Sequence, residues 1–366
     1  MDFSKWGQPS EEWLALEKAN PEIRAPPPGS TPLEMQTIIN NAYRQVSQSL
    51  LQSTGLKNLV STQDYIVPVR DGQSITVRSY RPSSLTSGPP LPAYLYHHGG
   101  GFVLGNLETE GFQCAWLAHT LSLIVVHICY RCTPQYTGLT AWHDALDGFE
   151  WVMANLNVLG IDPTRVVVGG ISAGGSLTAT VVQNEVKRAR ETNTPVRIKG
   201  QVLGIPYLIN PDRYPYHLFA DKSKASLAQL EDVPVIPKSR LDLFQELLGS
   251  EVDPGNPTWC PGLASEDELK GTPQTVFLIA GYDPLRDEGL LYAQKLKNAG
   301  VRTKVHIFPG LPHAFHRFLQ LPSRKRWNEV MLEGLRWAKA DQDEWNVELP
   351  PPPEFVGAKS QDAATQ

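Results

Sequence analysis

A serine inside a glycine-rich turn is the residue of this chain that could most directly carry out covalent chemistry. The apolar run Val166–Val168 leads into Gly170-Ile171-Ser172-Ala173-Gly174, and a small-residue pattern typical of a helix follows. A strand, a Gly-x-Ser-x-Gly turn and a helix in this order are typical of a nucleophile elbow, whose strained bend exposes the serine. We therefore expect Ser172 to project its hydroxyl to solvent at the end of a strand. The motif alone is also compatible with a turn that carries an incidental serine.

A second glycine-rich segment follows the buried-strand pattern Leu91–Tyr96. Its sequence is His97-His98-Gly99-Gly100-Gly101-Phe102, and the three consecutive glycines leave backbone N–H groups uncovered. A serine that attacks a carbonyl group needs such donors, because negative charge develops on the carbonyl oxygen. The alternatives are a flexible turn or a phosphate-binding loop, but a phosphate loop would require a lysine after the glycines, and none follows.

The two segments together could supply the donors of an oxyanion hole. We assign this hole to the backbone amides of Gly100, Gly101 and Ala173, which lie in the glycine loop and directly after the serine. We expect His98 to support the loop through hydrogen bonds and not to act as a base. A serine nucleophile beside preorganised amide donors predicts acyl-transfer chemistry.

Two further strand-like runs each lead to a residue that could complete a catalytic triad. The apolar run Thr275–Ala280 leads to Asp283, and the alternating run Val301–Phe308 leads to His313. The order Ser, Asp, His along the chain is the one that α/β-hydrolases use. Taken singly, an aspartate before proline usually forms a turn, and a loop histidine is usually solvated. The three residues in this order, each after a strand-like run, argue against a chance arrangement.

Each of the last two residues has a competitor nearby. Asp287 falls in the expected first turn of the next helix, where a carboxylate favours the helix dipole. We choose Asp283 because it directly follows the end of the strand. His316 lies three residues after His313, at a point where a helix is expected to begin.

With these motifs the chain resembles the hormone-sensitive-lipase-like carboxylesterases, a group of α/β-hydrolases marked by a His-Gly-Gly-Gly loop. The similarity covers roughly residues 65–340 and includes the segments Tyr130–Gln135, Ile161–Arg165 and Asp283–Gly289. It implies an α/β-hydrolase fold, with a mostly parallel sheet flanked by helices. It also implies a helical cap built from the N-terminus and from an insertion after strand six, and it favours His313 as the base.

Three positions depart from the family pattern. Ile171 stands where relatives commonly carry Asp or Glu, Gln135 where they carry Glu, and Ala314 where Gly follows the histidine. The first two changes remove charge beside the site. Substrate preference and pH optimum are therefore carried over less safely than the triad.

The N-terminal part of the chain, residues 1–60, is expected to form a helical cap segment. One helix begins at Ser10, and a second begins with the capping box Thr31–Glu34 and stops at Gly55. A hairpin that turns at Asp71-Gly72 follows.

The hydrolase core is expected to span residues 61–345. A cap insertion at about residues 207–265 interrupts it, and Arg240–Leu248 carries a helical pattern inside that insertion. Residues 346–366 are rich in proline at their start and lack apolar periodicity, so we expect them to be disordered.

Composition narrows the class of protein further. A chain of 366 residues fits one hydrolase core with an attached cap. The formal net charge of −5 argues against a nucleic-acid surface, which needs clustered Lys and Arg. Cys129 and Cys132 form one CxxC pair, but no second close-set pair completes a zinc site.

Neither a secretory leader nor an apolar run long enough to span a bilayer is evident. We therefore expect a cytoplasmic protein without membrane contact. The substrate is expected to be a small-molecule ester or thioester, cleaved through an acyl-enzyme on Ser172. No metal or organic cofactor is expected. A biosynthetic deacylase or thioesterase role and a homodimer are left open.

Two alternatives from other functional classes use the same fold. The first is a non-catalytic ligand receptor, but such relatives usually lack a triad member, and this chain retains all three. The second is a lyase, dehydratase or cyclase. Related dehydratases carry threonine in place of the nucleophile, whereas this chain carries Ser172.

Overall fold

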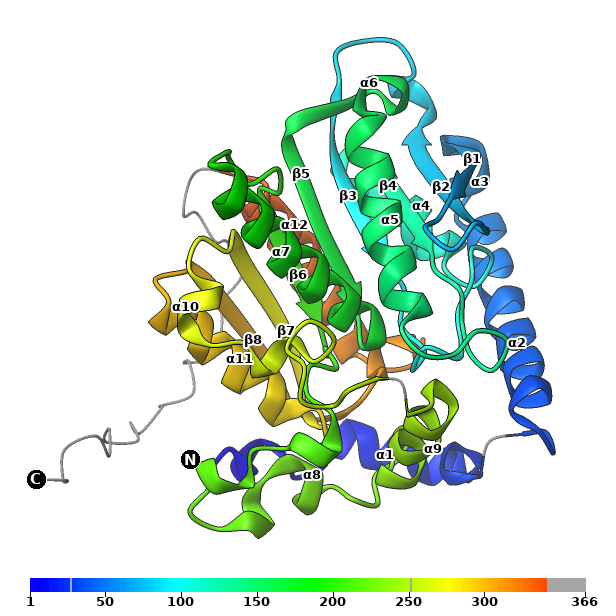
Figure 1. Ribbon diagram of the computed structural model, residues 1–366. Coiled ribbons are helices and arrows are strands. Elements are labelled where there is room, and N and C mark those ends of the chain that lie inside the picture. Colours follow the sequence, from blue (N-terminus) through cyan, green and yellow to red (C-terminus); the bar gives the residue numbers. More distant parts are fainter. Residues whose placement is uncertain (27, 251, 341–366) are drawn as a thin grey trace, which may run out of the picture.

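The centre of the molecule is an eight-stranded sheet, seen in a computed structural model that describes residues 1–26, 28–250 and 252–340 (Figure 1). The strands lie in the order β1-β2-β4-β3-β5-β6-β7-β8. Their bounds are β1 Val60–Pro68, β2 Ser74–Pro82, β3 Leu91–His97, β4 Ile124–Cys129, β5 Ile161–Ile171, β6 Gly200–Gly204, β7 Gln274–Tyr282 and β8 Thr303–Pro312. Strand β2 runs antiparallel to both of its neighbours, β1 and β4, and the other neighbouring strands pair in parallel, so the predicted mostly parallel sheet is confirmed.

Helices cover both faces of this sheet (Figure 1). Helices α5, α7 and α11 pack on one face, and α4 and α12 pack on the other. The bounds of the helices in the described ranges are α1 Glu11–Ala19, α2 Pro32–Ser53, α3 Leu56–Leu59, α4 Gly111–Leu121, α5 Thr140–Ala154, α6 Leu156–Leu159, α7 Ala173–Thr192, α8 Ser226–Gln229, α9 Lys238–Leu248, α10 Glu266–Leu269, α11 Arg286–Asn298 and α12 Ser323–Ala338.

Two hydrophobic clusters hold these layers together. In β5, Val166 and Val168 belong to the cluster under α5, α7 and α11, whereas Val167 belongs to the cluster under α4 and α12. Successive side chains of a strand point to opposite faces, so a strand covered on both sides must be apolar throughout. This is why the central strands are continuous apolar runs in the sequence.

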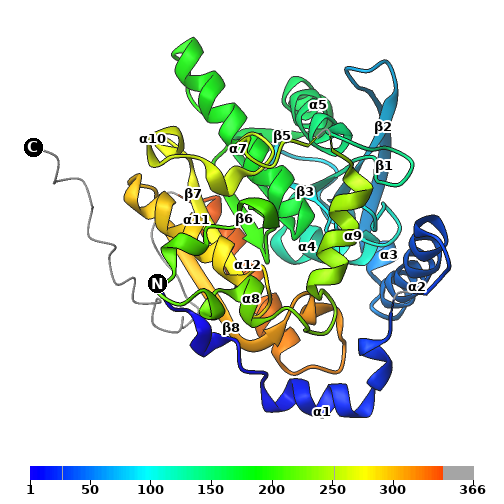
Figure 2. The same ribbon diagram turned by 60° about the horizontal axis from the view of Figure 1, so that its bottom comes forward.

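The carboxyl ends of the parallel strands meet at one edge of the sheet. Helix α1 of the N-terminal segment and helices α8 and α9 of the insertion after β6 lie together at this edge (Figures 1 and 2). The segments that follow β5, β7 and β8 emerge at the same edge. The residues that could do chemistry are therefore brought beneath these helices.

The N-terminal segment is attached to the rest of the chain by specific contacts. The Trp13 side chain is fully buried and meets the Phe318 ring edge-on at 5.2 Å. The N-terminal amino group of Met1 donates a hydrogen bond of 2.9 Å to the Leu218 carbonyl in the insertion. The two segments predicted to form a cap thus contact each other directly.

Helix α2 begins and ends where the sequence predicts, but its first turn differs in one bond. The Thr31 hydroxyl accepts a hydrogen bond from the Glu34 amide, as expected for a capping box. The Glu34 carboxylate, however, accepts from the Ser30 amide at 2.8 Å. The reciprocal contact is thus made one residue earlier than predicted. At the other end, Gly55 adopts a φ of 72°, a left-handed conformation that favours glycine.

Two boundaries near the C-terminus were predicted wrongly. The last strand continues past Phe308 to Pro312, because β8 pairs with β7 across a register shift that ends at Tyr282 and Pro312. No α-helix starts at His316; the chain forms a short 3₁₀ helix there, Phe315–Arg317, and α12 begins only at Ser323. The predicted disordered tail, residues 346–366, lies outside the described residues, as do residues 341–345 of the predicted core.

Candidate active site

Ser172 occupies a sharp turn between β5 and α7. Its backbone has φ 54° and ψ −118°, a conformation that is costly for a residue with a side chain. The turn is possible only because glycines flank it: a Cβ at Gly170 would collide with the carbonyl of Gly174, and a Cβ at Gly174 would collide with the carbonyl oxygen of His97. The local geometry is that of a nucleophile elbow.

The Ser172 hydroxyl does not face bulk solvent, contrary to our expectation. The residue is 6% exposed and lines a cavity together with Ile236 and Phe244, which belong to the insertion after β6. The sequence pattern around a strand end carries no information on a segment that folds over it from elsewhere in the chain. Access to the hydroxyl is therefore through the cavity.

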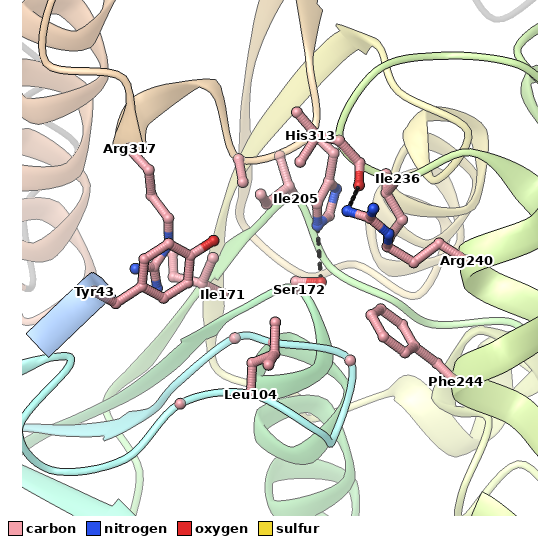
Figure 3. A pocket seen from close by; sticks show the side chains of 16 residues that line it. Tyr43, Leu104, Ile171, Ser172, Ile205, Ile236, Arg240, Phe244, His313 and Arg317 are labelled. Atoms are coloured by element: carbon pink, nitrogen blue, oxygen red, sulfur yellow. Dashed lines mark hydrogen bonds between the residues drawn. The ribbon is translucent and has the colours of Figure 1, made fainter. Parts of the chain in front are cut away.

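Three polar side chains form one hydrogen-bonded chain at this turn. His313 Nε2 lies 2.9 Å from Ser172 Oγ (Figure 3). On the other side of the ring, His313 Nδ1 lies 2.7 Å from Asp283 Oδ2. Asp283 is 1% exposed, and its other oxygen accepts a hydrogen bond from the Leu285 amide. A carboxylate at Nδ1 holds the proton on that nitrogen, which leaves Nε2 free to accept the serine proton.

The competing acid, Asp287, is used elsewhere. Its carboxylate accepts a hydrogen bond of 2.6 Å from the Ser226 amide and pairs with Arg286 at 2.6 Å. Both members of that pair are buried. Asp287 therefore joins α11 to the insertion, while Asp283 alone of the two contacts His313.

The competing histidine, His316, is a packing residue. Its ring stacks on Trp327 at 4.3 Å with an interplanar angle of 8°. Burial holds the pKa of His316 well below its ordinary value, so the ring is neutral. Between the two histidines, Ala314 adopts a φ of 55°, the left-handed conformation that a glycine would tolerate more easily.

The glycine loop after β3 lies against the elbow. Gly100 and Gly101 have φ values of 126° and 63°, and a Cβ at Gly101 would collide with the Phe244 ring. Within the described ranges, the amides of Gly100, Gly101 and Ala173 donate no hydrogen bond to protein. Three N–H groups on the two segments that flank Ser172 are thus available to an acceptor.

His98 lies beneath this loop. Its ring stacks on Tyr130 at 4.2 Å, and its Nδ1 donates a hydrogen bond of 2.9 Å to the Gly99 carbonyl. The Tyr130 hydroxyl donates in turn to the His98 carbonyl at 2.8 Å. Burial lowers the pKa of His98. The side chain contacts the loop from below and touches none of the three residues of the hydrogen-bonded chain.

Two cavities meet at Ser172. We call the first, of about 80 Å³, the His313 cavity, and the second, of about 20 Å³, the Leu241 cavity. The His313 cavity is lined by Tyr43, Gly99, Gly100, Gly101, Leu104, Gly105, Ile171, Ser172, Ile205, Val235, Ile236, Arg240, Phe244, His313, Ala314 and Arg317. The Leu241 cavity is lined by Gly101, Phe102, Ser172, Ala173, Tyr207, Ile236, Leu241, Phe244, Gln245, Leu248 and Leu285.

A third cavity, of about 170 Å³, adjoins the His313 cavity and shares Tyr43, Ile171 and Arg317 with it. Glu110 lies in its wall and pairs with Arg317 at 2.7 Å. Burial acts against the charge of Glu110, but Arg317 outweighs it and lowers the pKa of this carboxyl to about 2. Arg317, which lies in the wall between the two cavities, is therefore neutralised by Glu110 on the side of the third cavity.

Sequence reasoning missed several residues of the site. Tyr43 comes from α2, and Arg240 comes from α9 in the insertion. Neither lies near a recognisable motif, and no local signal could have identified them. Gln36, also in α2, donates a hydrogen bond to the Thr133 carbonyl and accepts one from Gln135. Gln135, one of the three departures from the family pattern, thus helps to hold α2 in place.

Glu288, in the first turn of α11, is a further buried carboxyl near the site. It accepts a hydrogen bond of 2.6 Å from the Leu208 amide, in the segment that follows β6. Tyr207, one residue earlier, donates its amide to the Ser172 carbonyl. Burial raises the pKa of Glu288 well above its ordinary value, and the charge of Asp283 adds to this effect. Glu288 thus links the segment that carries Asp283 to the turn around Ser172.

Across the ranges that the structure describes, no group of three His, Cys, Asp or Glu side chains is arranged to hold a metal ion. The four cysteines are free thiols. In the same ranges, no helix combines the length and apolar character needed to cross a membrane.

Comparison with known proteins agrees with this geometry. A family model described as the alpha/beta hydrolase fold matches residues 94–317. Versiconal hemiacetal acetate esterase of Dothistroma septosporum is 33% identical over 252 residues, covering 68% of this chain and 74% of that protein. Ethyl acetate hydrolase of Pseudomonas putida is 35% identical over 263 residues, covering 69% of this chain and 75% of that protein.

Among solved structures, a vibralactone cyclase is similar with a TM-score of 0.78 and 28% identity, covering 91% of this chain and 96% of the other. The chain belongs to the α/β-hydrolase fold family, and its resemblance to the hormone-sensitive-lipase-like carboxylesterases is confirmed. Within that family it is a carboxylic ester hydrolase.

The contacts of the two aspartates predict opposite effects on activity and stability. We expect Asp283→Asn to lower kcat for p-nitrophenyl acetate by about 10⁴-fold, because the amide would favour the wrong tautomer of His313. Asp287→Asn should keep kcat within about tenfold but lower the free energy of unfolding by about 3–5 kcal/mol, since it leaves Arg286 buried without its partner. Steady-state kinetics and thermal unfolding of both variants test this, and a larger loss of kcat from Asp287→Asn would reverse the assignment.

The buried carboxyl of Glu288 predicts a pH dependence of stability. Its folded pKa is raised, so the unfolded chain loses this proton first, and stability falls as pH rises from about 4.5 through the folded pKa. Glu288→Gln removes the titration and keeps an acceptor for the Leu208 amide. The melting temperature of the variant should therefore fall less than that of the wild type between about pH 5 and pH 8. Parallel pH profiles for the two proteins would contradict the buried neutral state.

Proposed function

We propose that Ser172, His313 and Asp283 are the catalytic triad of this esterase and that the enzyme removes short acyl groups, of the acetate class, from larger alcohols. The observation that carries this proposal is the unbroken hydrogen-bonded chain from Ser172 through His313 to Asp283, beside three available backbone amides. A nucleophile, a base, a buried carboxylate and oxyanion donors, the elements of a serine acyl-transfer site, thus lie around the point where the two cavities meet.

The reaction follows from this geometry. The Ser172 oxygen attacks the ester carbonyl carbon while His313 Nε2 takes the serine proton, and Asp283 stabilises the imidazolium. The carbonyl oxygen gains the negative charge and accepts hydrogen bonds from the amides of Gly100, Gly101 and Ala173. His313 then gives its proton to the departing alcohol oxygen. A water molecule, deprotonated by His313, releases the acid from the acyl-enzyme.

The position of His313 distinguishes the two sides of the substrate. The alcohol oxygen must come within hydrogen-bond reach of His313 Nε2 to receive its proton. His313 lines the His313 cavity but not the Leu241 cavity. The alcohol part of the ester therefore occupies the His313 cavity, and the acyl part occupies the Leu241 cavity beside Ala173.

The size of the Leu241 cavity limits the acyl group. Its volume is about 20 Å³, and large side chains close it, among them Phe102, Tyr207 and Leu248. This space is suited to an acetyl group and would require rearrangement for a long chain. The names of the two esterase relatives, a hemiacetal acetate esterase and an ethyl acetate hydrolase, support the same acyl class.

We further propose that the segments 1–60 and 207–265 act as a cap over the core. The support is that α2 places Tyr43, and α9 places Arg240 and Phe244, in the wall of the His313 cavity. A cytoplasmic location and a homodimer remain predictions from the sequence. The cyclase relative shows that its fold also supports cyclisation in that protein, but the features of this site that we describe are those of ester hydrolysis.

The nucleophile assignment is tested by Ser172→Ala. We expect kcat for p-nitrophenyl acetate to fall by about 10⁶-fold, because truncating the serine of such a triad removes the covalent route. The variant should retain the wild-type circular dichroism spectrum and melting temperature within a few degrees. A folded variant that hydrolyses the ester within about tenfold of the wild-type rate would show that another residue attacks the carbonyl.

The assignment of the two cavities is tested by a matched pair of leucine substitutions. Wild type should show its highest kcat/KM on p-nitrophenyl acetate, with a decline towards the octanoate. Leu241→Ala should raise kcat/KM for the butyrate relative to the acetate by about tenfold. The enlarged cavity would bury the two additional methylenes of the butyryl group, at roughly 0.8 kcal/mol each.

Leu104→Ala, on the alcohol side, should leave the chain-length profile unchanged and alter the ratio between ethyl acetate and phenyl acetate. An N-acetylcysteamine thioester of the same acyl group extends the series to thioesters. If Leu104→Ala, and not Leu241→Ala, shifted the acyl preference, the two cavities would have to be exchanged.

A further inference from the structure

The His313 cavity contains a positive charge that no carboxylate neutralises. Its sixteen lining residues include two arginines, Arg240 and Arg317, and no Asp or Glu. Arg317 pairs with Glu110 at 2.7 Å, and its guanidinium lies 4.6 Å from the centre of the Tyr43 ring. Arg240 has no carboxylate within salt-bridge distance among the residues that the structure places. Figure 3 shows the two arginines on opposite sides of Ser172.

The hydrogen-bonding capacity of Arg240 is mostly unused. One Nη donates a hydrogen bond of 2.6 Å to the Val235 carbonyl, and this is the sole bond to protein that the described ranges give it (Figure 3). A guanidinium has five N–H donors in a planar fork that matches a carboxylate. The remaining donors of Arg240 are available to a ligand in the His313 cavity.

The position of Arg240 is electrostatically unfavourable for the fold. It is the third residue of α9, and a cation in the first turn of a helix faces the positive end of the helix dipole. Lys238 in the same turn offsets this with an ion pair to Asp242 at 2.7 Å, whereas Arg240 does not. Partial burial also lowers the pKa of Arg240. A charge placed at such a cost without a partner suits a residue that meets one on binding.

We propose that Arg240 binds a carboxylate on the alcohol part of the substrate, so that the enzyme prefers short-chain acyl esters of hydroxy acids. This inference rests on the proposed function, because it uses the assignment of the His313 cavity to the alcohol. Arg240 shares that cavity with His313 and is absent from the wall of the Leu241 cavity. Arg240 therefore binds a carboxylate on the leaving alcohol and not on the acyl group.

A purely structural role for Arg240 makes a different prediction. Val235 has a φ of 70°, which is rare for a β-branched residue, and Arg240 bonds to its carbonyl. Arg240 could thus hold this turn of the insertion in place and nothing more. Loss of such support would change the rate for every ester by the same factor, whereas loss of a carboxylate partner would affect anionic esters alone.

The test compares anionic and neutral esters of equal shape. The probes are 3- and 4-acetoxybenzoate and the corresponding acetoxybenzamides, and the proteins are wild type, Arg240→Gln, Arg240→Lys and the control Lys238→Gln. The two isomers place the carboxylate at different distances from the ester. We expect wild type to prefer one benzoate over its amide by about tenfold or more in kcat/KM, mainly through KM.

Arg240→Gln should lower kcat/KM for that benzoate by about 10- to 100-fold and leave the amide within about threefold. Arg240→Lys should keep part of the preference, and Lys238→Gln should keep all of it. For wild type alone, KM for the benzoate should rise on going from about 0.05 to 0.5 M NaCl while KM for the amide stays constant, which tests the charge even if Arg240→Gln does not fold.

Three results would overturn the inference. An equal loss of activity on benzoates and amides in Arg240→Gln would show that Arg240 has a structural role. KM values that do not change with salt would show that the enzyme does not recognise the charge of the substrate. Phenyl succinate carries its charge on the acyl side. A higher kcat/KM for this ester than for the acetoxybenzoates would show that the carboxylate binds on the acyl side and not on the alcohol side. Hydrolysis of phenyl acetate in these cases would leave the proposed function standing, whereas failure to hydrolyse any acetate ester would remove both.

Discussion

Close approach of the polypeptide backbone at one point governs the geometry of the whole site. The turn after β5 packs against the loop after β3 so tightly that a single Cβ at Gly174 would strike the His97 carbonyl oxygen. This contact places the turn around Ser172 beside the Gly99–Gly101 loop. The available amides of Gly100, Gly101 and Ala173 therefore lie on both sides of the serine. The φ of 54° at Ser172 is costly, and it is held by the tight packing of the turn on both sides.

Asp283 and His313 reach Ser172 through a different constraint, the pairing of the last two strands. Strands β7 and β8 run in parallel and end near each other, and their register shift pairs Tyr282 with Pro312. The residues that follow directly, Asp283 and His313, then meet at 2.7 Å. Ala314, in a left-handed conformation, turns the chain away immediately afterwards. The hydrogen-bonded chain is thus a consequence of where two strands stop, which rigid, fully buried elements can specify closely.

The sheet and the segments that we propose as a cap have separate physical tasks in this arrangement. The sheet and its two hydrophobic clusters position Ser172, Asp283 and His313, and they do so with buried apolar residues. The walls of the two cavities come largely from outside the sheet, through Tyr43 of α2 and Arg240, Leu241 and Phe244 of α9. Substitutions in α2 and α9 can therefore change what binds while the hydrogen bonds among Ser172, His313 and Asp283 are retained, because the two sets of contacts share few residues.

The sequence by itself determined the features that depend on local order: the strands, the elbow around Ser172, the glycine loop and the positions of Asp283 and His313 at strand ends. Hydrophobic periodicity and the residue preferences of turns depend on a few neighbouring residues, so they can be recognised in the sequence without a structure. Tertiary structure alone decided that Ser172 is covered and that Asp287 joins Ser226 and Arg286 instead of the histidine. It also decided that Arg240 enters the cavity with no carboxylate partner among the described residues. These outcomes depend on contacts between segments far apart in the chain, which burial and charge pairing select only once the fold has brought them together.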